Sequence, residues 1–385
     1  MKIVHIAPSA PYNDYWGYQE NLLPKYQKKA GHDVTVITTN TMHRDGKITE
    51  IDPDDYVLND GVRVIRLKRE RYAFPILTSM CAKLKTFPYL KELKPDFIFF
   101  HGLVSTTIFD AVKYKKRINP KCVIVQDNHT DDNNTHTDRF LKDLLVRLFY
   151  RTIHRFTNRY VSRVYGVTPW RKRYAEDYFK VDPSKTDILI MGADDEKIDF
   201  TNRERIRSGI RRQHQITDDD FLVVTGGKID KNKHIDLLME ACGDLSGVKL
   251  MVFGQVLEDV KARFEQLLRE NENIVYVGWI PADTVYNYFF AADLVVFPGG
   301  HSVLWEQACA SKTPCLFEKW DGMQHVDNGG NSRFIDAVSV ENIRKDIQLL
   351  LLTEDYKAMK AAAESEKTDI YLYSRIAKKS IECVE

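Results

Sequence analysis

Short apolar runs alternate with amphipathic segments along almost the whole chain. The runs Lys2–Ala7, Phe97–Phe100 and Leu294–Phe297 are mostly apolar and lack the two-residue alternation of a half-exposed strand. They therefore predict strands that are buried on both faces of a parallel sheet. Segments with an apolar residue every three or four positions lie between them, for example 19–30 and 257–270, and predict helices. This alternation predicts an α/β protein with parallel sheets.

The strand and helix pattern begins a second time in the middle of the chain. Residues 196–220 are polar and charged, which is typical of a hinge region, and a new series of strands starts at Phe221. We predict a first domain over residues 1–195 and a second domain over residues 196–370, with a helical C-terminal segment over residues 371–385.

One run in the first half has a different pattern. Apolar and polar residues alternate from Gly61 to Leu67, and this alternation predicts a strand that is more exposed than the others.

Composition and charge narrow the class of protein. A chain of 385 residues with 43% hydrophobic residues can form two cores, and a net charge of +1 gives no global attraction for nucleic acid. The six cysteines are scattered without a Cys-x-x-Cys pair, as in a cytosolic protein with reduced thiols. No signal peptide precedes the first strand and no uncharged apolar run is long enough to span a bilayer. We expect a cytoplasmic protein that at most lies on a membrane surface.

Polar loops follow three predicted strands of the first half. They are the loop Pro8–Tyr18, the turn at His101 and the loop that contains His129. Ligands of open parallel sheets bind beyond the carboxyl ends of the strands, so we expect these loops to line one binding site. The Asp- and His-rich loop 127–138 could also be interpreted as a metal site, but no regular ligand spacing supports that alternative.

Two turns of the second half favour a bound diphosphate. In 297–314, a strand is followed by two glycines and by a predicted helix that begins near Ser302, with Glu306 one turn into it. In 225–236, a strand ends in glycines and three lysines, Lys228, Lys231 and Lys233. This second segment is not a P-loop, because it lacks the spacing Gly-x4-Gly-Lys-Ser/Thr. The alternatives are an ordinary strand–helix turn with a surface glutamate and a solvated basic loop. Parallel strands would place both turns at one sheet edge.

Taken in order, these segments resemble the family 4 glycosyltransferases of the GT-B type. Gly227-Lys-Ile-x-x-x-Lys233 is similar to the family's Gly-Arg-Leu-x-x-x-Lys element, and 305–314 is similar to its Glu-Ala-x-Ala-x-Gly-x-Pro element. The resemblance covers nearly the whole chain. It implies two Rossmann-like parallel-sheet domains that face across a cleft, with the C-terminal helix returning to the first domain.

The resemblance also implies a reaction and roles for named residues. A glycosyl group would pass from a nucleoside-diphosphate sugar to an acceptor, with retention of configuration and without a metal ion or other cofactor. Lys228 and Lys233 would hold the diphosphate, Glu306 the ribose hydroxyls, and His129 would lie where sugar and acceptor meet. Tyr18 and His101 would lie on the acceptor side. The expected donor contacts are Gly17, Gly227, Gly254, Trp279, Ile280, Gly300, His301, Ser302 and Val303.

The chain departs from the family pattern at one position. The family has a second glutamate before the one matched by Glu306, and it contacts the transferred sugar; Pro298 stands at the expected place. His301 or the backbone could take over this contact. This departure favours one alternative, a non-catalytic scaffold with the same fold. A second alternative, a nucleotide-sugar epimerase, has the same fold but another reaction.

A basic amphipathic segment points to the acceptor. Residues 139–163 predict one long helix or two, and arginines recur at every fourth position beside an apolar side. Arg66–Tyr72 and Phe74–Leu77 add a second basic and apolar patch. Such surfaces bind anionic lipid, which suits a lipid-linked glycan acceptor at the inner face of the cytoplasmic membrane. The alternative is a helix half-buried in its domain with solvated arginines. The membrane-facing candidates are Arg147, Arg151, Arg155 and Arg159.

Overall fold

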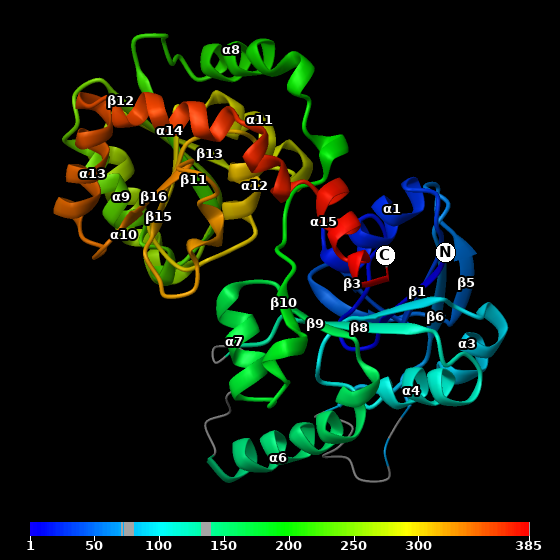
Figure 1. Ribbon diagram of the computed structural model, residues 1–385. Coiled ribbons are helices and arrows are strands. Elements are labelled where there is room, and N and C mark those ends of the chain that lie inside the picture. The colour runs from blue at the N-terminus through cyan, green and yellow to red at the C-terminus, as the bar shows by residue number, and fades with distance from the viewer. Residues whose placement is uncertain (71, 73–80, 132–139, 385) are drawn as a thin grey trace. The chain divides into compact units, whose positions relative to one another are not determined.

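The computed structural model describes residues 1–70, 72, 81–131 and 140–384 (Figure 1). The chain forms two compact units. The first comprises Met1–Ile190 and Ile376–Glu385, and the second comprises Met191–Arg375.

The first unit is built on an eight-stranded sheet. Its strand order is β10-β9-β8-β7-β1-β2-β6-β5, and all neighbours are parallel except β5 and β6. The strands are β1 (Lys2–Ala7), β2 (Asp33–Thr39), β5 (Asp54–Val57), β6 (Arg63–Leu67), β7 (Phe97–Phe100), β8 (Val123–Asn128), β9 (Arg163–Gly166) and β10 (Thr186–Ile188). A separate hairpin pairs β3 (Thr41–Arg44) with β4 (Lys47–Glu50). The helices of this unit are α1 (Gln19–Lys29), α3 (Phe87–Leu93), α4 (Ile108–Arg117), α6 (Phe140–Thr157) and α7 (Pro169–Asp177).

The prediction of an exposed strand at Gly61–Leu67 is wrong. β6 lies between β2 and β5, and four of its five residues are buried. The alternation of apolar and polar residues gave a wrong prediction because one of the polar residues, Arg66, is buried as well and is only 2% exposed. Its guanidinium donates to Tyr12 O (2.8 Å) and to Asp14 Oδ1 (2.9 Å), which fixes the loop that follows β1. Arg66 is therefore an internal cation and belongs to no surface patch; Phe74–Leu77 lies outside the described residues.

The second unit has the strand order of a dinucleotide-binding fold. Six parallel strands are arranged as β13-β12-β11-β14-β15-β16. The strands are β11 (Phe221–Ile229), β12 (Val248–Val256), β13 (Ile274–Gly278), β14 (Leu294–Phe297), β15 (Cys315–Glu318) and β16 (Ser332–Ile335). The helices are α8 (Arg203–Gln213), α9 (Ile235–Gly243), α10 (Glu258–Glu270), α11 (Val285–Ala291), α12 (Leu304–Ala310), α13 (Val340–Leu352) and α14 (Asp355–Glu364). The predicted fold class, two Rossmann-like parallel-sheet units, is confirmed.

Two predicted boundaries in the second unit are wrong. β11 does not stop at Thr225 but continues through both glycines to Ile229, because Gly227 pairs in register with Gly254 of β12. A Cβ on Gly254 would lie 1.9 Å from Gly227 O, so the two strands approach this closely only without side chains. Helix α12 begins at Leu304, and its N-cap is Val303 rather than Ser302.

The end of the chain returns to the first unit, as predicted. The last helix is α15 (Tyr373–Lys379). From Ile376 onward, its residues belong to the first unit. Figure 1 shows this helix, in red, beside α1, and Gln27 Nε2 of α1 donates to Ser380 Oγ at 2.9 Å. Tyr165 OH donates to Lys379 O at 3.5 Å.

Candidate functional site

The strand order of the second unit reverses between β11 and β14. Because β11 and β14 are parallel neighbours, their carboxyl ends lie at one edge of the sheet, where such folds bind ligands. The loop after β14 packs directly on the loop after β11: Gly300 N donates to Asn232 O at 3.1 Å. A Cβ on Gly299 would lie 2.4 Å from the same oxygen, so this contact requires a glycine. The structure thus brings the two predicted turns together.

The lysines of the first turn differ in their surroundings. Lys233 Nζ donates to Gly300 O and, at 3.4 Å, to His301 O, and burial lowers the pKa of this lysine. It therefore ties the two loops together. The side chain of Lys228 is 65% exposed and lies 3.5 Å from Asp230 Oδ2. Lys228 is available to an anionic ligand from solvent, whereas Lys233 already has two carbonyl partners.

Glu306 is completely buried and lies between two histidines. His301 Nε2 donates to Glu306 Oε1 at 2.9 Å, and His325 Nε2 donates to the same oxygen at 2.8 Å. Burial alone would raise the pKa of Glu306, but the two imidazoles lower it to about 2. The other carboxylate oxygen, Oε2, is buried and has no hydrogen-bond partner among the described residues. A buried ionised oxygen of this kind is a strong acceptor for a ligand hydroxyl.

The same three side chains are of metal-ligating types. Within the described ranges, His301, Glu306 and His325 form the one group whose potential ligand atoms all lie within 4.8 Å of one another. Both Nε2 atoms donate protons to the carboxylate, so a metal ion would have to replace these hydrogen bonds.

A hollow lies beside the carboxyl end of β12. It is lined by Gly254, Gln255, Val256, Glu258, Lys261, Phe264, Glu265, Leu268, Tyr276 and Trp279. The indole of Trp279 is 73% exposed, and Tyr276 OH donates to Gly254 O at 2.7 Å. The structure therefore brings together Gly254 and Trp279, two of the predicted donor contacts. Ile280 is half-buried directly after Trp279, and Ser302 and Val303 are half-buried in the turn between β14 and α12.

In the first unit, the predicted histidines meet at one aspartate. His101 Nδ1 donates to Asp127 Oδ2 at 2.8 Å, and His129 Nε2 donates to the same oxygen at 3.3 Å. Gly102 N donates to Asp127 Oδ1 at 2.6 Å. Burial lowers the pKa of His129, but the Asp127 carboxylate outweighs it and raises this pKa above its usual value. His101 is buried, and the side chain of His129 is 36% exposed. The predicted contacts Gly17 and Tyr18 are exposed just before α1.

The four predicted membrane-facing arginines, three in α6 and Arg159 in the turn Asn158–Tyr160 after it, differ in their surroundings. Arg151 Nε donates to Tyr178 O at 2.8 Å, and the Arg147 guanidinium lies 5.7 Å from the Tyr178 ring. Arg155 and Arg159 are exposed. A spacing of four residues advances about 40° beyond a full helical turn at each step, so the row winds around the helix. Arg147 and Arg151 are half-buried against the segment around Tyr178, and the membrane-facing role of the four arginines stays a prediction. In the described part of the chain, no helix is both long and apolar enough to cross a bilayer.

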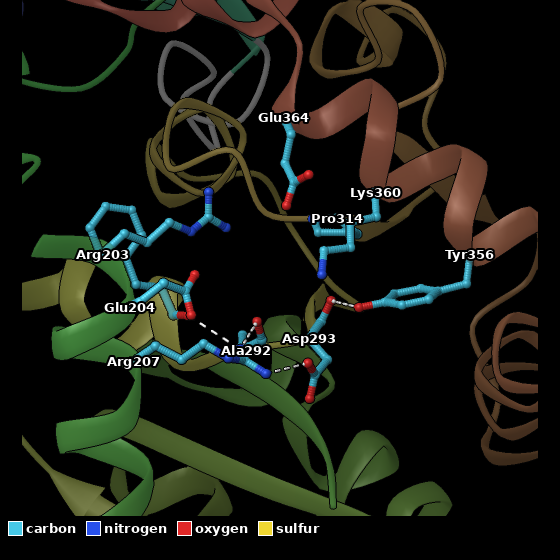
Figure 2. Close-up of a pocket in the computed structure, with 10 residues that line it drawn as sticks. Arg203, Glu204, Arg207, Ala292, Asp293, Pro314, Tyr356, Lys360 and Glu364 are labelled. Atoms are coloured by element: carbon cyan, nitrogen blue, oxygen red, sulfur yellow. Dashed lines mark hydrogen bonds and ion pairs between the residues drawn. The ribbon is translucent and has the colours of Figure 1, made fainter. Parts of the chain in front are cut away.

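Another hollow of the second unit lies at the opposite edge of its sheet. Figure 2 shows Arg207 of α8 and Tyr356 of α14 converging on Asp293, the residue that precedes β14. Arg207 Nη2 lies 2.6 Å from Asp293 Oδ1, and Tyr356 OH donates to Asp293 O at 3.0 Å. This hollow is at the amino end of β14 and does not include the glycine turns, so we interpret its charges as structural.

The sequence assigns no individual role to Asp127 or His325, and it predicts Arg66 in a basic surface patch. Asp127 and His325 each hold a predicted site residue, and Arg66 orders the loop after β1. Asp127 lies two residues after the apolar run Cys122–Val125, a position that could have identified it. His325 lies in no recognisable motif. Its contact with Glu306 depends on how the segment between the two residues folds, so no sequence signal could have predicted it.

Two family models together match most of the chain. Residues 22–197 match the model described as Glycosyltransferase Family 4, and residues 207–367 match the model described as Glycosyl transferases group 1. A search of curated protein sequences gave no match.

Solved structures with the same fold cover almost the whole chain. A glycosyltransferase from Rickettsia africae has a TM-score of 0.68 at 14% identity, covering 100% of this chain and 97% of the other. Sucrose-phosphate synthase from Thermosynechococcus elongatus has a TM-score of 0.64 at 16% identity, covering 99% and 97%. Anabaena HepE in complex with UDP-glucose has a TM-score of 0.64 at 14% identity, covering 99% and 98%.

Proposed function

Because the chain belongs to the family 4 glycosyltransferases of the GT-B type, we propose that it transfers a sugar from a nucleoside-diphosphate sugar to a glycan acceptor. The observation that carries this proposal is the buried Glu306 carboxylate, which lies where the strand order of the second sheet reverses between β11 and β14. Its oxygen Oε2 has no hydrogen-bond partner among the described residues. A neutral sugar hydroxyl can satisfy this oxygen without bringing in a second charge.

We assign the parts of the donor to separate groups of the second unit. Glu306 Oε2 accepts a ribose hydroxyl, and Lys228, supported by Lys233, stabilises the leaving diphosphate. The hollow beside Trp279 takes the base, since the exposed indole offers a stacking surface. HepE, which shares the fold, binds UDP-glucose, and this supports a nucleotide-sugar donor. With lysines neutralising the diphosphate, we propose a retaining transfer that needs no metal ion.

Binding of a nucleotide sugar should raise the unfolding temperature. Of UDP-, GDP-, ADP- and TDP-sugars, at least one is expected to stabilise the protein in a thermal-shift assay with EDTA present. At a ligand concentration of 100 times Kd the gain is about 2.7 kcal/mol. Lys233→Ala and Glu306→Ala should weaken it. Lys231→Ala, which removes an exposed lysine from the same turn, is the matched control. The donor assignment fails if no nucleotide sugar stabilises the protein.

A product assay separates transfer from the two alternatives. An epimerase would convert the nucleotide sugar without an acceptor, and a scaffold would bind it and leave it unchanged. Pro298 in place of the family's other glutamate motivates the scaffold alternative, because it leaves the transferred sugar without that carboxylate. His301, whose side chain is 6% exposed and hydrogen-bonded to Glu306, is the residue that we propose takes its place.

We propose that the acceptor is lipid-linked and that α6 docks the protein on an anionic membrane. The exposed face of α6 carries Leu145 (63% exposed), Leu148 (49%), Phe156 (60%) and Arg155, and the exposed Arg159 lies in the turn Asn158–Tyr160 that follows α6. The opposite face packs into the first unit through Tyr150 and Ile153, both in its hydrophobic core. An apolar face flanked by arginines suits an interfacial helix. The protein would then act at the inner face of the cytoplasmic membrane.

Vesicle binding should depend on the two exposed arginines. The double variant Arg155→Ala/Arg159→Ala is expected to lose about 30-fold in partitioning to vesicles of anionic phospholipid, since each arginine contributes about 1 kcal/mol near such a surface. The control Arg205→Ala/Arg212→Ala removes two exposed arginines of α8 and should bind normally. Flotation measures both. Failure of the unaltered protein to bind vesicles would remove the membrane proposal.

A further inference from the structure

A continuous row of hydrogen bonds runs beneath His129 in the first unit. It begins in the C-terminal segment, passes through α1 and β1, and reaches the ends of β7 and β8. Its members, in order, are Ser380, Gln27, His5, His101, Asp127 and His129. All of them except His129 are buried.

The C-terminal end of the row fixes the orientation of the Gln27 amide. Ser380 Oγ donates its proton to Ala377 O at 2.6 Å, so it can only accept from Gln27. Gln27 Nε2 donates to Ser380 Oγ at 2.9 Å. The amide oxygen of Gln27 therefore faces His5 Nε2 at 2.7 Å, and His5 Nε2 must carry a proton.

Counting protons between the two ends gives the charge of the histidine pair. Three hydrogen bonds connect Gln27 Oε1 to Asp127 Oδ2, and both of these end atoms only accept. The bonds are His5 Nε2 to Gln27, His5 Nδ1 to His101 Nε2 (3.0 Å), and His101 Nδ1 to Asp127. Each needs one hydrogen, whereas two neutral imidazoles supply only two. The pair therefore holds three protons and one positive charge.

We propose that His5 and His101 hold this additional proton as a built-in cation, and that it positions the candidate catalytic residue His129 by keeping Asp127 ionised and oriented. The proposal rests on the role proposed above for His129. His5, His101 and Asp127 act through His129 and are positioning residues. Ser380 and Gln27 also belong to this arrangement, because their hydrogen bonds determine how many protons the pair His5 and His101 needs.

The surroundings place the charge on His101. Burial lowers the pKa of His5 to about 3, so the proton between the rings belongs to His101, which lies against the carboxylate. The charged groups that act on His129 are Asp127, Glu20 of α1 and Arg171 of α7. Arg171 is paired with Asp131 at 3.0 Å. Of these three groups, only Asp127 is a member of the hydrogen-bonded row, so the row acts on His129 through Asp127.

Nuclear magnetic resonance of protein with labelled histidine rings tests the proton count in the full chain. At pH 7, His101 should carry protons on both ring nitrogens and His5 only on Nε2. In Ser380→Ala, the Gln27 amide can rotate and donate to His5, so two protons suffice. His101 should then carry a single ring proton, on Nδ1, at pH 7. Ser380→Thr keeps the hydroxyl and should behave as the unaltered protein. A single ring proton on His101 of the unaltered protein at pH 7, or equal numbers of ring protons on His101 in the two variants, would overturn the proposal.

His101→Asn tests the action on His129. The amide can still donate to Asp127 but brings no charge, so His129 becomes the main cation beside Asp127. Its pKa should rise by about one unit, and the limb of the kcat/KM profile that belongs to His129 should move to higher pH with it. The control His214→Asn changes a histidine at the end of α8 in the second unit and should leave the His129 pKa and the pH profile unchanged. A uniform loss of activity with an unmoved His129 titration would contradict the positioning role. The resonance measurement needs no activity, so failure of the proposed transfer is recognised separately.

Discussion

Glu306→Gln is expected to lower kcat/KM for the sugar donor by about 10- to 150-fold. A hydrogen bond to a charged group contributes about 1.5–3 kcal/mol, and the substitution removes the charge while keeping the shape of the side chain. The amide oxygen can still accept from His301 and His325, but an NH₂ group replaces Oε2, the acceptor proposed for a ribose hydroxyl.

The kinetic form of this loss identifies its cause. A ribose hydroxyl is bound in both the ground state and the transition state, so most of the change should appear as a raised KM for the donor. Steady-state kinetics with varied donor measures it. Glu354→Gln, at a glutamate whose side chain is 83% exposed, is the matched control and should change neither constant. An unchanged donor KM in Glu306→Gln would remove the carboxylate from the donor site.

Asp293→Asn is expected to destabilise the second unit by about 3–5 kcal/mol. Asp293 Oδ2 accepts from Leu222 N at 2.7 Å and lies 3.1 Å from Nη1 of Arg211, whose side chain is 3% exposed. Removing one partner of a buried ion pair leaves the other charge without compensation, which costs about this much. Because whole domains are stable by only about 5–15 kcal/mol, the loss should be plain in urea denaturation.

Two further variants show whether the unpaired charge is the reason. Asp283→Asn, at a half-exposed carboxylate 3.5 Å from Lys197, should cost less than about 1 kcal/mol. Adding Arg211→Met to Asp293→Asn should recover part of the lost stability, since no buried cation is then left unpaired. If Asp283→Asn and Asp293→Asn cost the same, the ion pair is not the source of the stabilisation.

Local pattern predicted a large part of this protein. Strands such as Phe97–Phe100 and Leu294–Phe297 are so uniformly apolar that only a sheet covered on both faces suits them, and their observed bounds agree with the prediction. The order of strands, glycine turns and helices also led to the fold class. Glu306 and Lys233 could be singled out because they follow a strand and a glycine turn within a few residues.

Tertiary structure decided the partners of these residues and their charge. The sequence predicts Arg66 as a surface cation, yet this residue is buried in the structure. Its partners Tyr12 and Asp14 lie more than fifty residues away along the chain and contact it only in the folded state. The same is true of His325 at Glu306 and of Gln27 at Ser380, which are separated by 353 positions. Burial and hydrogen bonding set a protonation state, and both depend on contacts between distant segments. The sequence by itself therefore determined which elements form and where their turns lie, whereas only the folded chain decided which side chains are buried together and which proton each one holds.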